Sequence, residues 1–137
     1  MERELTAGLI IRDKKILLLN NTKYGLLRVE PPGGKVRAGE SYIEALKREV
    51  REELGVEAGR FRFFGVYGTD SPEGEFPVHM YFCDILSGEP TNMEPEKSSG
   101  LCWYGVSAME RLMREGSLVK NMALALPSLK RVLSAKA

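Results

Sequence analysis

Three carboxylates, Glu49, Glu52 and Glu53, lie close together in the stretch "ALKREVREELGV". A helix turns by about 100° per residue, so these side chains would crowd one sector of a helix. Carboxylates three and four residues apart destabilise a helix by about 0.2–0.5 kcal/mol per pair. A divalent cation would relieve this repulsion, because Mg²⁺ prefers oxygen ligands and commonly bridges carboxylates to substrate phosphates. The pattern therefore indicates either a metal site or a solvated acidic face.

The same helix needs an apolar face that packs against the rest of the protein. On a helical wheel the acidic sector lies beside that face, at the boundary between core and solvent. Ala45 falls within the acidic sector, where its small side chain would leave room for a ligand, whereas Arg48 falls beyond Glu52 and away from the patch. The predicted core-facing residues are Ile43, Leu46, Val50 and Leu54.

A glycine-rich loop comes directly before this helix. It contains Gly33-Gly34-Lys35 and, further along, Gly39. Glycine lets the backbone approach a ligand closely, and lysine supplies a mobile positive charge that suits a phosphate. Glycine loops are also common as plain turns. Beside a cluster of carboxylates, however, this loop favours metal-assisted phosphate chemistry.

Capping signals predict where the helices begin and end. Ser41 and Glu44 form a capping box, so the carboxylate helix should begin at Tyr42, and Gly55 suits the position just past its end. A second capping box, Ser107 with Glu110, predicts a helix over residues 108–116. A last helix should cover much of residues 117–137, with a kink or a restart at the proline within it.

Runs of branched and aromatic residues predict strands between these helices. Residues 5–12 and 15–20 form a predicted hairpin across Asp13-Lys14, and a short extended piece follows near residues 26–29. The prolines and glycines of residues 31–34 should then end regular structure. Further strands are predicted over residues 61–68, 78–86 and 101–106, separated by a turn-rich connection (69–77) and a polar loop (87–100). This mixed order is typical of a sheet covered by helices on its faces.

The composition excludes several classes of partner. The chain has 137 residues, which suits one domain spanning 1–137, and 20 basic against 19 acidic residues leave a net charge of +1. This balance gives no basis for a nucleic-acid or membrane partner, and no apolar run is long enough to span a bilayer. Cys83 and Cys102 both lie in apolar segments and are predicted to be buried, reduced thiols, which favours a cytoplasmic location.

The carboxylate helix and its loop together resemble the signature of the Nudix hydrolases, the MutT-like family. The resemblance spans residues 34–56, and the flanking order of strands and helices extends it more loosely over nearly the whole chain. One departure is Pro31, because the family often has a large apolar residue before Pro-Gly-Gly. The matching positions are Gly34, Glu40, Arg48-Glu49-Val50, Glu52-Glu53 and Gly55-Val56.

The resemblance implies a single-domain α/β/α sandwich around a mixed β-sheet. It also implies hydrolysis of a nucleoside diphosphate linked to another group, with Mg²⁺ or Mn²⁺ as cofactor. By position, Glu49, Glu52 and Glu53 would be metal ligands, with Glu53 the foremost, and the carbonyl of Gly34 would be a further ligand.

The resemblance assigns further roles around the metal site. Glu40 and Arg48 would hold the loop and the helix together, and Lys35 would contact phosphate. His79, the only histidine, alternates with apolar residues on a predicted strand, so it either has a structural role or lines a base pocket. Tyr24 is a candidate for stacking on a base.

The segment "NMEPEK" with a following Trp103 resembles a loop of Nudix enzymes that act on nucleoside triphosphates. Glu94 and Glu96 lie on this loop, which would fold over the metal site. Either of them, or Glu53, is a candidate general base for the attacking water. The predicted reaction converts a nucleoside triphosphate, or a modified one, to the monophosphate and pyrophosphate.

Two other functions remain open at this point. Pro72 resembles a proline of ADP-ribose-hydrolysing relatives, which makes ADP-ribose or another sugar nucleotide the alternative substrate. A nucleotide-binding sensor without catalysis is the second alternative, although such proteins usually lack one of the box glutamates. Many relatives pair into dimers, so a homodimer is also an open expectation.

Overall fold

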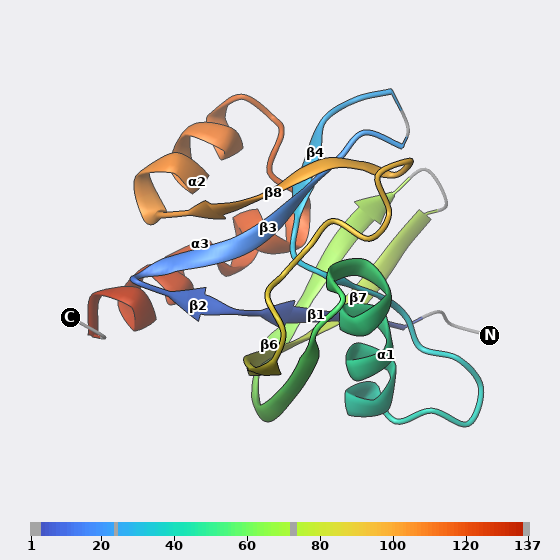
Figure 1. Ribbon diagram of the computed structural model, residues 1–137. Coiled ribbons are helices and arrows are strands. Elements are labelled where there is room, and N and C mark those ends of the chain that lie inside the picture. Colours follow the sequence, from blue (N-terminus) through green and yellow to red (C-terminus); the bar gives the residue numbers. More distant parts are fainter. Residues whose placement is uncertain (1–3, 24, 72–73, 136–137) are drawn as a thin grey trace.

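The computed structural model describes residues 4–23, 25–71 and 74–135. Groups of strands are followed by helices, in the mixed order expected for a sheet covered by helices on its faces (Figure 1). The elements are β1 (Leu5–Leu9), β2 (Ile11–Arg12), β3 (Lys15–Asn21), β4 (Arg28–Glu30), β5 (Gly33–Lys35), α1 (Tyr42–Leu54), β6 (Glu57–Ser71), β7 (Gly74–Ser87), β8 (Ser98–Tyr104), α2 (Val106–Arg114) and α3 (Lys120–Ala135).

Within these described residues the strands form two sheets of four. In the first, the order is β5-β1-β7-β6, with β1 parallel to β7 and the other pairs antiparallel. In the second, β3 pairs with β2, β4 and β8, all antiparallel. The mixed strand directions confirm the expected sheet type.

Strand β3 shows how the layers are built. Ile16 and Leu18 belong to one buried cluster, which includes residues of α2 and α3, whereas Leu17 and Leu19 belong to another, which includes the buried face of α1. Successive side chains of a strand point to opposite faces, so a continuous apolar run is buried on both. Helix α1 therefore covers one face and α2 with α3 the other, which confirms the α/β/α sandwich (Figure 1).

Helix α1 begins and ends as its caps predict. The Ser41 side chain accepts a hydrogen bond from the Glu44 N–H, and the Glu44 carboxylate accepts one from the Ser41 N–H. At the other end, Gly55 adopts a left-handed conformation with φ 70°, and its N–H bonds to the Arg51 carbonyl. Both ends are thus fixed by local sequence.

The predicted N-terminal hairpin is only partly right. Strands β2 and β3 do form a hairpin, and Asp13 and Lys14 have positive φ (52° and 62°), as a tight two-residue turn requires. The preceding strand β1, however, ends at Leu9 and joins the other sheet. The expectation that residues 31–34 end regular structure is wrong as well, because Gly33–Lys35 pairs with β1.

The connection predicted over residues 69–77 is also largely strand. Thr69–Ser71 continues β6 and Gly74–Pro77 begins β7, so the two strands form one long hairpin. Pro72, on which the sugar-nucleotide alternative was based, lies outside the described residues.

Two further sequence predictions need correction. Helix α2 begins at Val106, one residue before Ser107, and Gly105 occupies the N-cap without a side-chain bond, so the second capping box is absent. Cys83 is buried as expected, but Cys102 is exposed.

Helix α3 continues through Pro127 as one helix. Within the described ranges, no helix has the length and apolarity that a membrane crossing needs.

Candidate active site

A cavity of about 540 Å³ lies between α1, β5, the β6–β7 hairpin and the start of α3. Its lining combines side chains of both charges, which suits a ligand that brings phosphates together with a cation. The acidic residues of the lining are Glu30, Glu49, Glu52, Glu53 and Glu94. The basic ones are Lys23, Arg28, Lys35, Arg37 and Lys97.

Helix α1 supplies one wall of the cavity, which Glu53 lines together with Glu49 and Glu52. The Gly33 N–H donates a hydrogen bond of 2.8 Å to Glu53 Oε1. Burial raises the pKa of the Glu53 carboxyl well above its usual range, and the charge of Glu49 adds to this rise in pKa. Burial also raises the pKa of Glu49, with Arg48 opposing the change. Both carboxyls therefore lie where an added positive charge would stabilise the ionised form.

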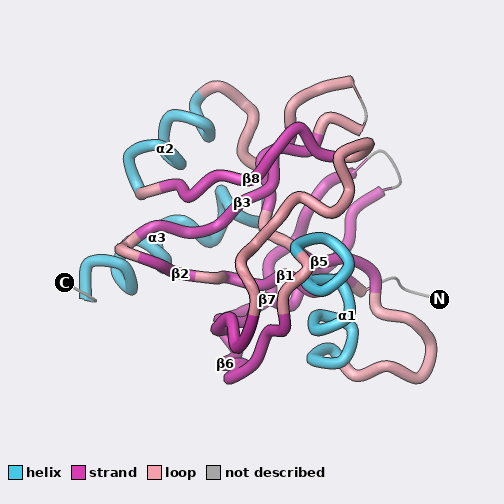
Figure 2. The backbone as a smooth tube through the Cα atoms, in the orientation of Figure 1, coloured by secondary structure: helices cyan, strands magenta, loops and turns pink. Residues whose placement is uncertain are grey.

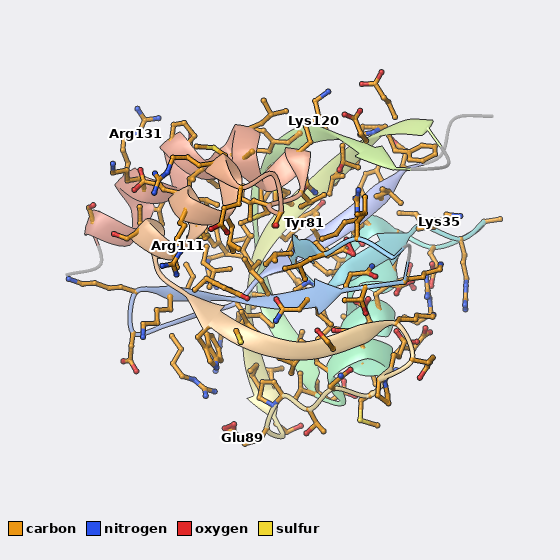
Figure 3. All side chains as sticks on the ribbon, turned by 90° about the horizontal axis from the view of Figure 1, so that it is seen from above. Lys35, Tyr81, Glu89, Arg111, Lys120 and Arg131 are labelled. Carbon is orange, nitrogen blue, oxygen red and sulfur yellow. The ribbon has the colours of Figure 1, made fainter. Side chains whose placement is uncertain are left out.

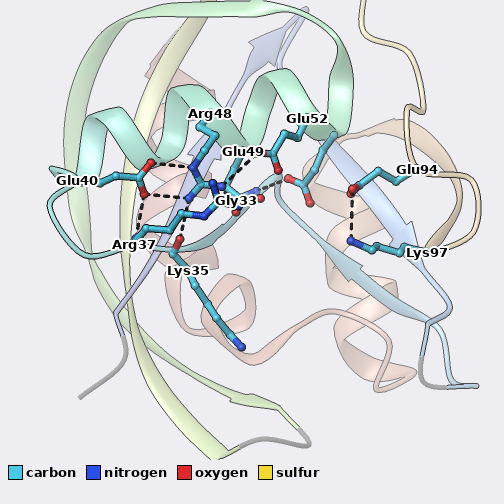
Figure 4. Close-up of polar contacts among 10 residues, drawn as sticks. Gly33, Lys35, Arg37, Glu40, Arg48, Glu49, Glu52, Glu94 and Lys97 are labelled. Atoms are coloured by element: carbon cyan, nitrogen blue, oxygen red, sulfur yellow. Dashed lines mark hydrogen bonds and ion pairs between the residues drawn. The ribbon is translucent and has the colours of Figure 1, made fainter. Parts of the chain in front are cut away.

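Arg48 connects the loop to the carboxylates (Figure 4). On the loop side, its Nε donates to Glu40 Oε2 at 2.7 Å and its Nη2 to the Lys35 carbonyl at 3.0 Å. On the helix, its Nη1 donates to Glu49 at 2.9 Å and to Glu52 at 3.3 Å. The bonds from Arg48 to Glu40, together with one from the Arg37 N–H, hold the pKa of the Glu40 carboxyl down at about 2. The prediction from the helical wheel that Arg48 lies away from the acidic patch is wrong. A wheel shows only where each Cα lies, whereas the long Arg48 side chain reaches across to Glu49 and Glu52.

The face of α1 that carries Glu49 is turned towards the sheet. Ala45, expected to leave open space in the acidic sector, is fully buried, whereas Ile43, expected in the core, is 38% exposed. The buried face of α1 is therefore rotated towards the carboxylates, relative to the apolar face that the helical wheel predicts. Glu49 consequently lies over strand β5, against the backbone of the glycine loop.

Gly34 is the point of closest approach between loop and helix. A Cβ added there would lie 2.6 Å from Cδ and Oε1 of Glu49. Any other residue at position 34 would thus displace this carboxylate, so the glycine keeps the space over its own backbone for the Glu49 oxygens.

The chemistry of this donor set fits a divalent cation, since carboxylate and carbonyl oxygens are the ligands that Mg²⁺ prefers. Within the described part of the chain, no three acidic, histidine or cysteine side chains are already gathered as a metal-binding group. Arg48 bonds Glu49 and Glu52, and the Gly33 N–H bonds Glu53.

The loop between β7 and β8 crosses the C-terminal end of α1 (Figure 2). The Thr91 N–H donates to the Leu54 carbonyl at 2.9 Å, and the Met93 N–H donates to the Glu53 carbonyl at 3.1 Å. Glu94 lines the cavity, where its Oε2 lies 3.3 Å from Lys97 Nζ. Glu96, the other predicted loop carboxylate, is exposed and lies outside the cavity lining.

The predicted substrate contacts fall in different places. Lys35 lines the cavity, and Figure 4 shows its side chain extending away from α1. His79 lies outside the cavity lining; its ring stacks on Tyr42 at 4.0 Å and its Nε2 lies 3.2 Å from Glu4 Oε1. This geometry matches the structural alternative for His79. Tyr24 lies outside the described residues.

Glu30 is a carboxylate of the cavity that sequence reasoning missed. The Asn21 side-chain amide donates to its Oε1 at 2.7 Å, and burial raises the pKa of its carboxyl. The only sequence signal is the alternation Arg28-Val29-Glu30, which places the two charged residues on the same side of a short strand. Glu30 extends the acidic lining from α1 across to β4.

Comparison with known proteins decides the family. Residues 2–124, most of the chain, match the NUDIX domain. The chain belongs to the NUDIX hydrolase family. NUDIX hydrolases act on small nucleotide substrates and need a divalent metal.

Named NUDIX relatives differ in their substrates. The 8-oxo-dGTP diphosphatase of Buchnera aphidicola subsp. Schizaphis graminum (strain Sg) is 44% identical over 62 residues, covering 44% of this chain and 48% of that protein. The ADP-ribose pyrophosphatase of Methanocaldococcus jannaschii is 36% identical over 87 residues, covering 60% of this chain and 50% of that protein.

A solved NUDIX structure supports the same fold. The crystal structure of a MutT NUDIX hydrolase from Burkholderia pseudomallei superposes with a TM-score of 0.69 and is 28% identical. The match covers 79% of this chain and 86% of that one.

Proposed function

We propose that this NUDIX hydrolase cleaves the pyrophosphate bond of a nucleoside triphosphate, or of a modified one, to give the monophosphate and pyrophosphate. The observation that carries the proposal is the single cavity in which the α1 carboxylates meet Glu94 and a set of basic side chains. The resemblance to an 8-oxo-dGTP diphosphatase favours a triphosphate over other nucleotide substrates.

Glu49, Glu52, Glu53 and the carbonyl of Gly34 would hold the divalent cation, with Mg²⁺ or Mn²⁺ as the candidates. The bound cation would neutralise charge on the phosphates and increase the acidity of water in the site. The charge of the donor set supports this assignment, because Glu49 and Glu53 are partly buried beside one another and the Arg48 side chain bonds Glu49 but not Glu53.

The chain's own residues would orient the substrate and move the proton. Lys35 and Arg37, which line the cavity near the glycine loop, would bind phosphate oxygens and fix the direction of attack. Glu94 is the better placed of the two loop carboxylates to accept the proton of the attacking water, because its side chain lines the cavity and that of Glu96 does not. Lys97, which bonds Glu94, would hold this carboxylate in place.

A product-resolved hydrolysis assay tests the proposal. The purified chain is incubated with each deoxynucleoside triphosphate, with 8-oxo-dGTP and with ADP-ribose, in Mg²⁺, in Mn²⁺ and in EDTA. The expected result is metal-dependent release of pyrophosphate and a monophosphate from at least one triphosphate. Release of single phosphates, or equal turnover in EDTA, would contradict the proposed reaction.

ADP-ribose hydrolysis is the second candidate function, and the relative from Methanocaldococcus jannaschii supports it. The same assay separates the two candidates, since ADP-ribose would yield AMP and ribose 5-phosphate. Nucleotide binding without turnover in either metal would favour the sensor function instead.

Two structural expectations remain proposals of this kind. One is that residues 1–137 form a single NUDIX domain, and the other is that the protein forms a homodimer. Unfolding of the chain in one cooperative transition would support a single domain. The molecular mass measured by sedimentation equilibrium tests the homodimer.

A further inference from the structure

Three buried residues that line the cavity, Thr6, Thr69 and Asn121, each have a polar side-chain atom without a partner. Thr6 is 2% exposed, and the other two are each 5% exposed. Among the residues that the structure describes, Thr6 Oγ1, Thr69 Oγ1 and Asn121 Oδ1 accept and donate no hydrogen bond. Most buried polar atoms in proteins are hydrogen-bonded, so each of these requires an explanation. Thr6 differs from the other two in where its side chain points.

The alternation of side chains along β1 places Thr6 on the face of the sheet that α1 covers. Leu5 and Ala7, on either side of it, pack in the cluster that includes residues of α3. Successive side chains of a strand point to opposite faces, so Thr6 and Gly8 face α1. Gly8 agrees with this direction, because a Cβ added there would lie 3.4 Å from Cδ1 of Leu46, a buried residue of α1. The Thr6 hydroxyl is therefore buried between the sheet and α1.

The register of the neighbouring strands places Thr6 beside Glu49. Thr6 pairs with Gly34 of β5 on one side and with His79 of β7 on the other. The His79 ring stacks on Tyr42, the first residue of α1, so this row of residues lies under the helix. Residues directly opposite on neighbouring strands have Cβ atoms about 4.5–5.5 Å apart. The position of a Cβ on Gly34 is only 2.6 Å from Cδ and Oε1 of Glu49. A change of side-chain rotamer therefore suffices to bring the Thr6 hydroxyl and the Glu49 carboxylate together.

Glu49 has a different partner in the free protein. Arg48 Nη1 donates to Glu49 Oε1 at 2.9 Å, and Figure 4 shows this contact on the side of the glycine loop. A cation at the carboxylates would compete with Arg48, because both bring positive charge to the same oxygens. Carboxylates that bind a metal are themselves usually held by a hydrogen bond from another residue. The Thr6 hydroxyl is a donor next to Glu49 that has no other acceptor among the described residues.

We propose that Thr6 is a positioning residue of the metal site, whose hydroxyl donates a hydrogen bond to the Glu49 carboxylate when Glu49 exchanges Arg48 for a cation. The inference rests on the proposed function, which makes Glu49 a metal ligand. The exchange satisfies both groups, since Thr6 Oγ1 gains an acceptor and Glu49 gains a donor in place of the one that it gives up. The unsatisfied hydroxyl destabilises the free protein, so its pairing on cation uptake favours the bound state.

Thr69 provides a matched control at the other end of the cavity. It follows Tyr67 by two residues on β6, and Tyr67 packs in the cluster that includes residues of α3, so Thr69 points away from α1. Its neighbour Asp70 lies 3.5 Å from Lys120, next to Asn121 at the start of α3, and Figure 3 shows Lys120 beside the β6–β7 hairpin. Thr69 is thus a second buried threonine of the same cavity with the same unsatisfied atom, but it lies against α3 and not beside the carboxylates.

The first measurement is the affinity of the chain for Mn²⁺ alone, without nucleotide, followed by electron paramagnetic resonance of the free ion. Thr6→Val keeps the shape of the side chain and should weaken Mn²⁺ binding by about tenfold, as loss of a hydrogen bond to a metal ligand predicts. Thr6→Ser keeps the hydroxyl and should bind within about threefold of the wild type. Thr69→Val should bind Mn²⁺ as the wild type does. Unchanged affinity in Thr6→Val, or equal losses in Thr6→Val and Thr69→Val, would overturn the proposal.

The second measurement is thermal unfolding in EDTA, which needs neither metal nor turnover. In the wild-type background, Thr6→Val should leave the melting temperature equal or raise it, because the removed hydroxyl has no partner to lose. In the Arg48→Met background, Glu49 is free to accept the bond from Thr6, so adding Thr6→Val should lower the melting temperature by about 4 °C. An equal change in both backgrounds would overturn the proposal, because it would show that Thr6 and Glu49 are not coupled.

The outcomes also distinguish this inference from the proposed reaction. Mn²⁺ binding that Thr6→Val weakens and Thr6→Ser does not, with no hydrolysis of any triphosphate, would support the role of Thr6 and refute the reaction. Metal-dependent triphosphate hydrolysis, with Mn²⁺ affinity equal in the wild type and Thr6→Val, would support the reaction and refute the role of Thr6. Absence of Mn²⁺ binding by the wild type would refute the metal site and with it the role of Thr6.

Discussion

The two ends of the cavity differ in how their polar groups are satisfied. At the α1 end, Arg48 already bonds Glu49 and Glu52, and the Gly33 N–H bonds Glu53. At the other end, the side-chain oxygens of Thr69 and Asn121 have no partner among the described residues. The carboxylates of the first end are stabilised by the protein itself and must exchange some bonds to take up a cation. The second leaves two buried polar atoms without a protein partner among the described residues, and an unpaired buried polar atom lowers the stability of a folded protein.

The largest effect should come from Glu53→Gln, which changes only the first end. We expect turnover with Mg²⁺ to fall by about 10²–10⁴-fold, because the foremost proposed metal ligand and alternative base is lost. Binding of monophosphates in EDTA should not weaken, since the other end of the cavity is untouched. Glu57→Gln is the control, because Glu57 pairs with Arg51 outside the cavity lining. Full activity of Glu53→Gln would remove Glu53 from the mechanism.

The two loop carboxylates provide the next comparison. Glu94→Gln should slow turnover by about 100-fold if Glu94 accepts the proton of water. Glu96→Gln should have little effect, because Glu96 lies outside the cavity lining. Rates measured against pH make the test sharper, since loss of a general base removes the acidic limb of the profile. Equal rates for both variants would show that the base lies elsewhere.

A smaller effect, on stability, should follow from Arg48→Met. This change removes the charged hydrogen bonds that hold the carboxylates and the loop, and should lower the free energy of unfolding by about 2 kcal/mol. Arg51→Met on the same helix is the matched control: its exposed pair with Glu57 should contribute less than about 1 kcal/mol. Urea unfolding measures both. Added Mg²⁺ should restore part of the unfolding free energy lost in Arg48→Met, since the cation supplies positive charge at the same carboxylates. An equal response of Arg48→Met and Arg51→Met to Mg²⁺ would contradict this.

The smallest effect concerns pH. Arg48 holds the pKa of Glu40 at about 2, below its ordinary value of 4.5. A carboxyl whose pKa is lower in the folded protein contributes stability that is present above pH 4.5 and is lost as the pH falls towards 2. The stability difference between the wild type and Glu40→Gln should therefore shrink over this range. A difference that is constant from pH 7 to pH 2.5 in thermal unfolding would show that Glu40 contributes no charge-dependent stability.

The parts of the fold that local sequence determines were predictable. Ser41, Glu44 and Gly55 fix the ends of α1 through bonds within a few residues, and the family signature identified the wall of the cavity. Strand β5 was not predictable, because Gly33–Lys35 becomes a strand only by pairing with β1, about thirty residues away in the chain.

The site was predictable where it follows the helix and not where it depends on tertiary packing. The wheel identified the clustered glutamates but misplaced Ala45, Ile43 and Arg48, because it contains neither the rotation of α1 on the sheet nor the reach of a side chain. Thr69 and Asn121 lie on separate elements and carry no sequence signal. Only the packing of the hairpin against α3 brings them to one cavity.

The contact between the β7–β8 loop and α1 has a consequence for how such an enzyme can diverge. The carbonyls of Glu53 and Leu54 accept hydrogen bonds from the N–H groups of Met93 and Thr91, so these two bonds between loop and helix involve backbone atoms only and do not depend on the loop side chains. Substitutions in the loop can therefore change the group that faces the substrate and still deliver it to the same position. A new reactivity could arise there through single replacements, without any rebuilding of the scaffold.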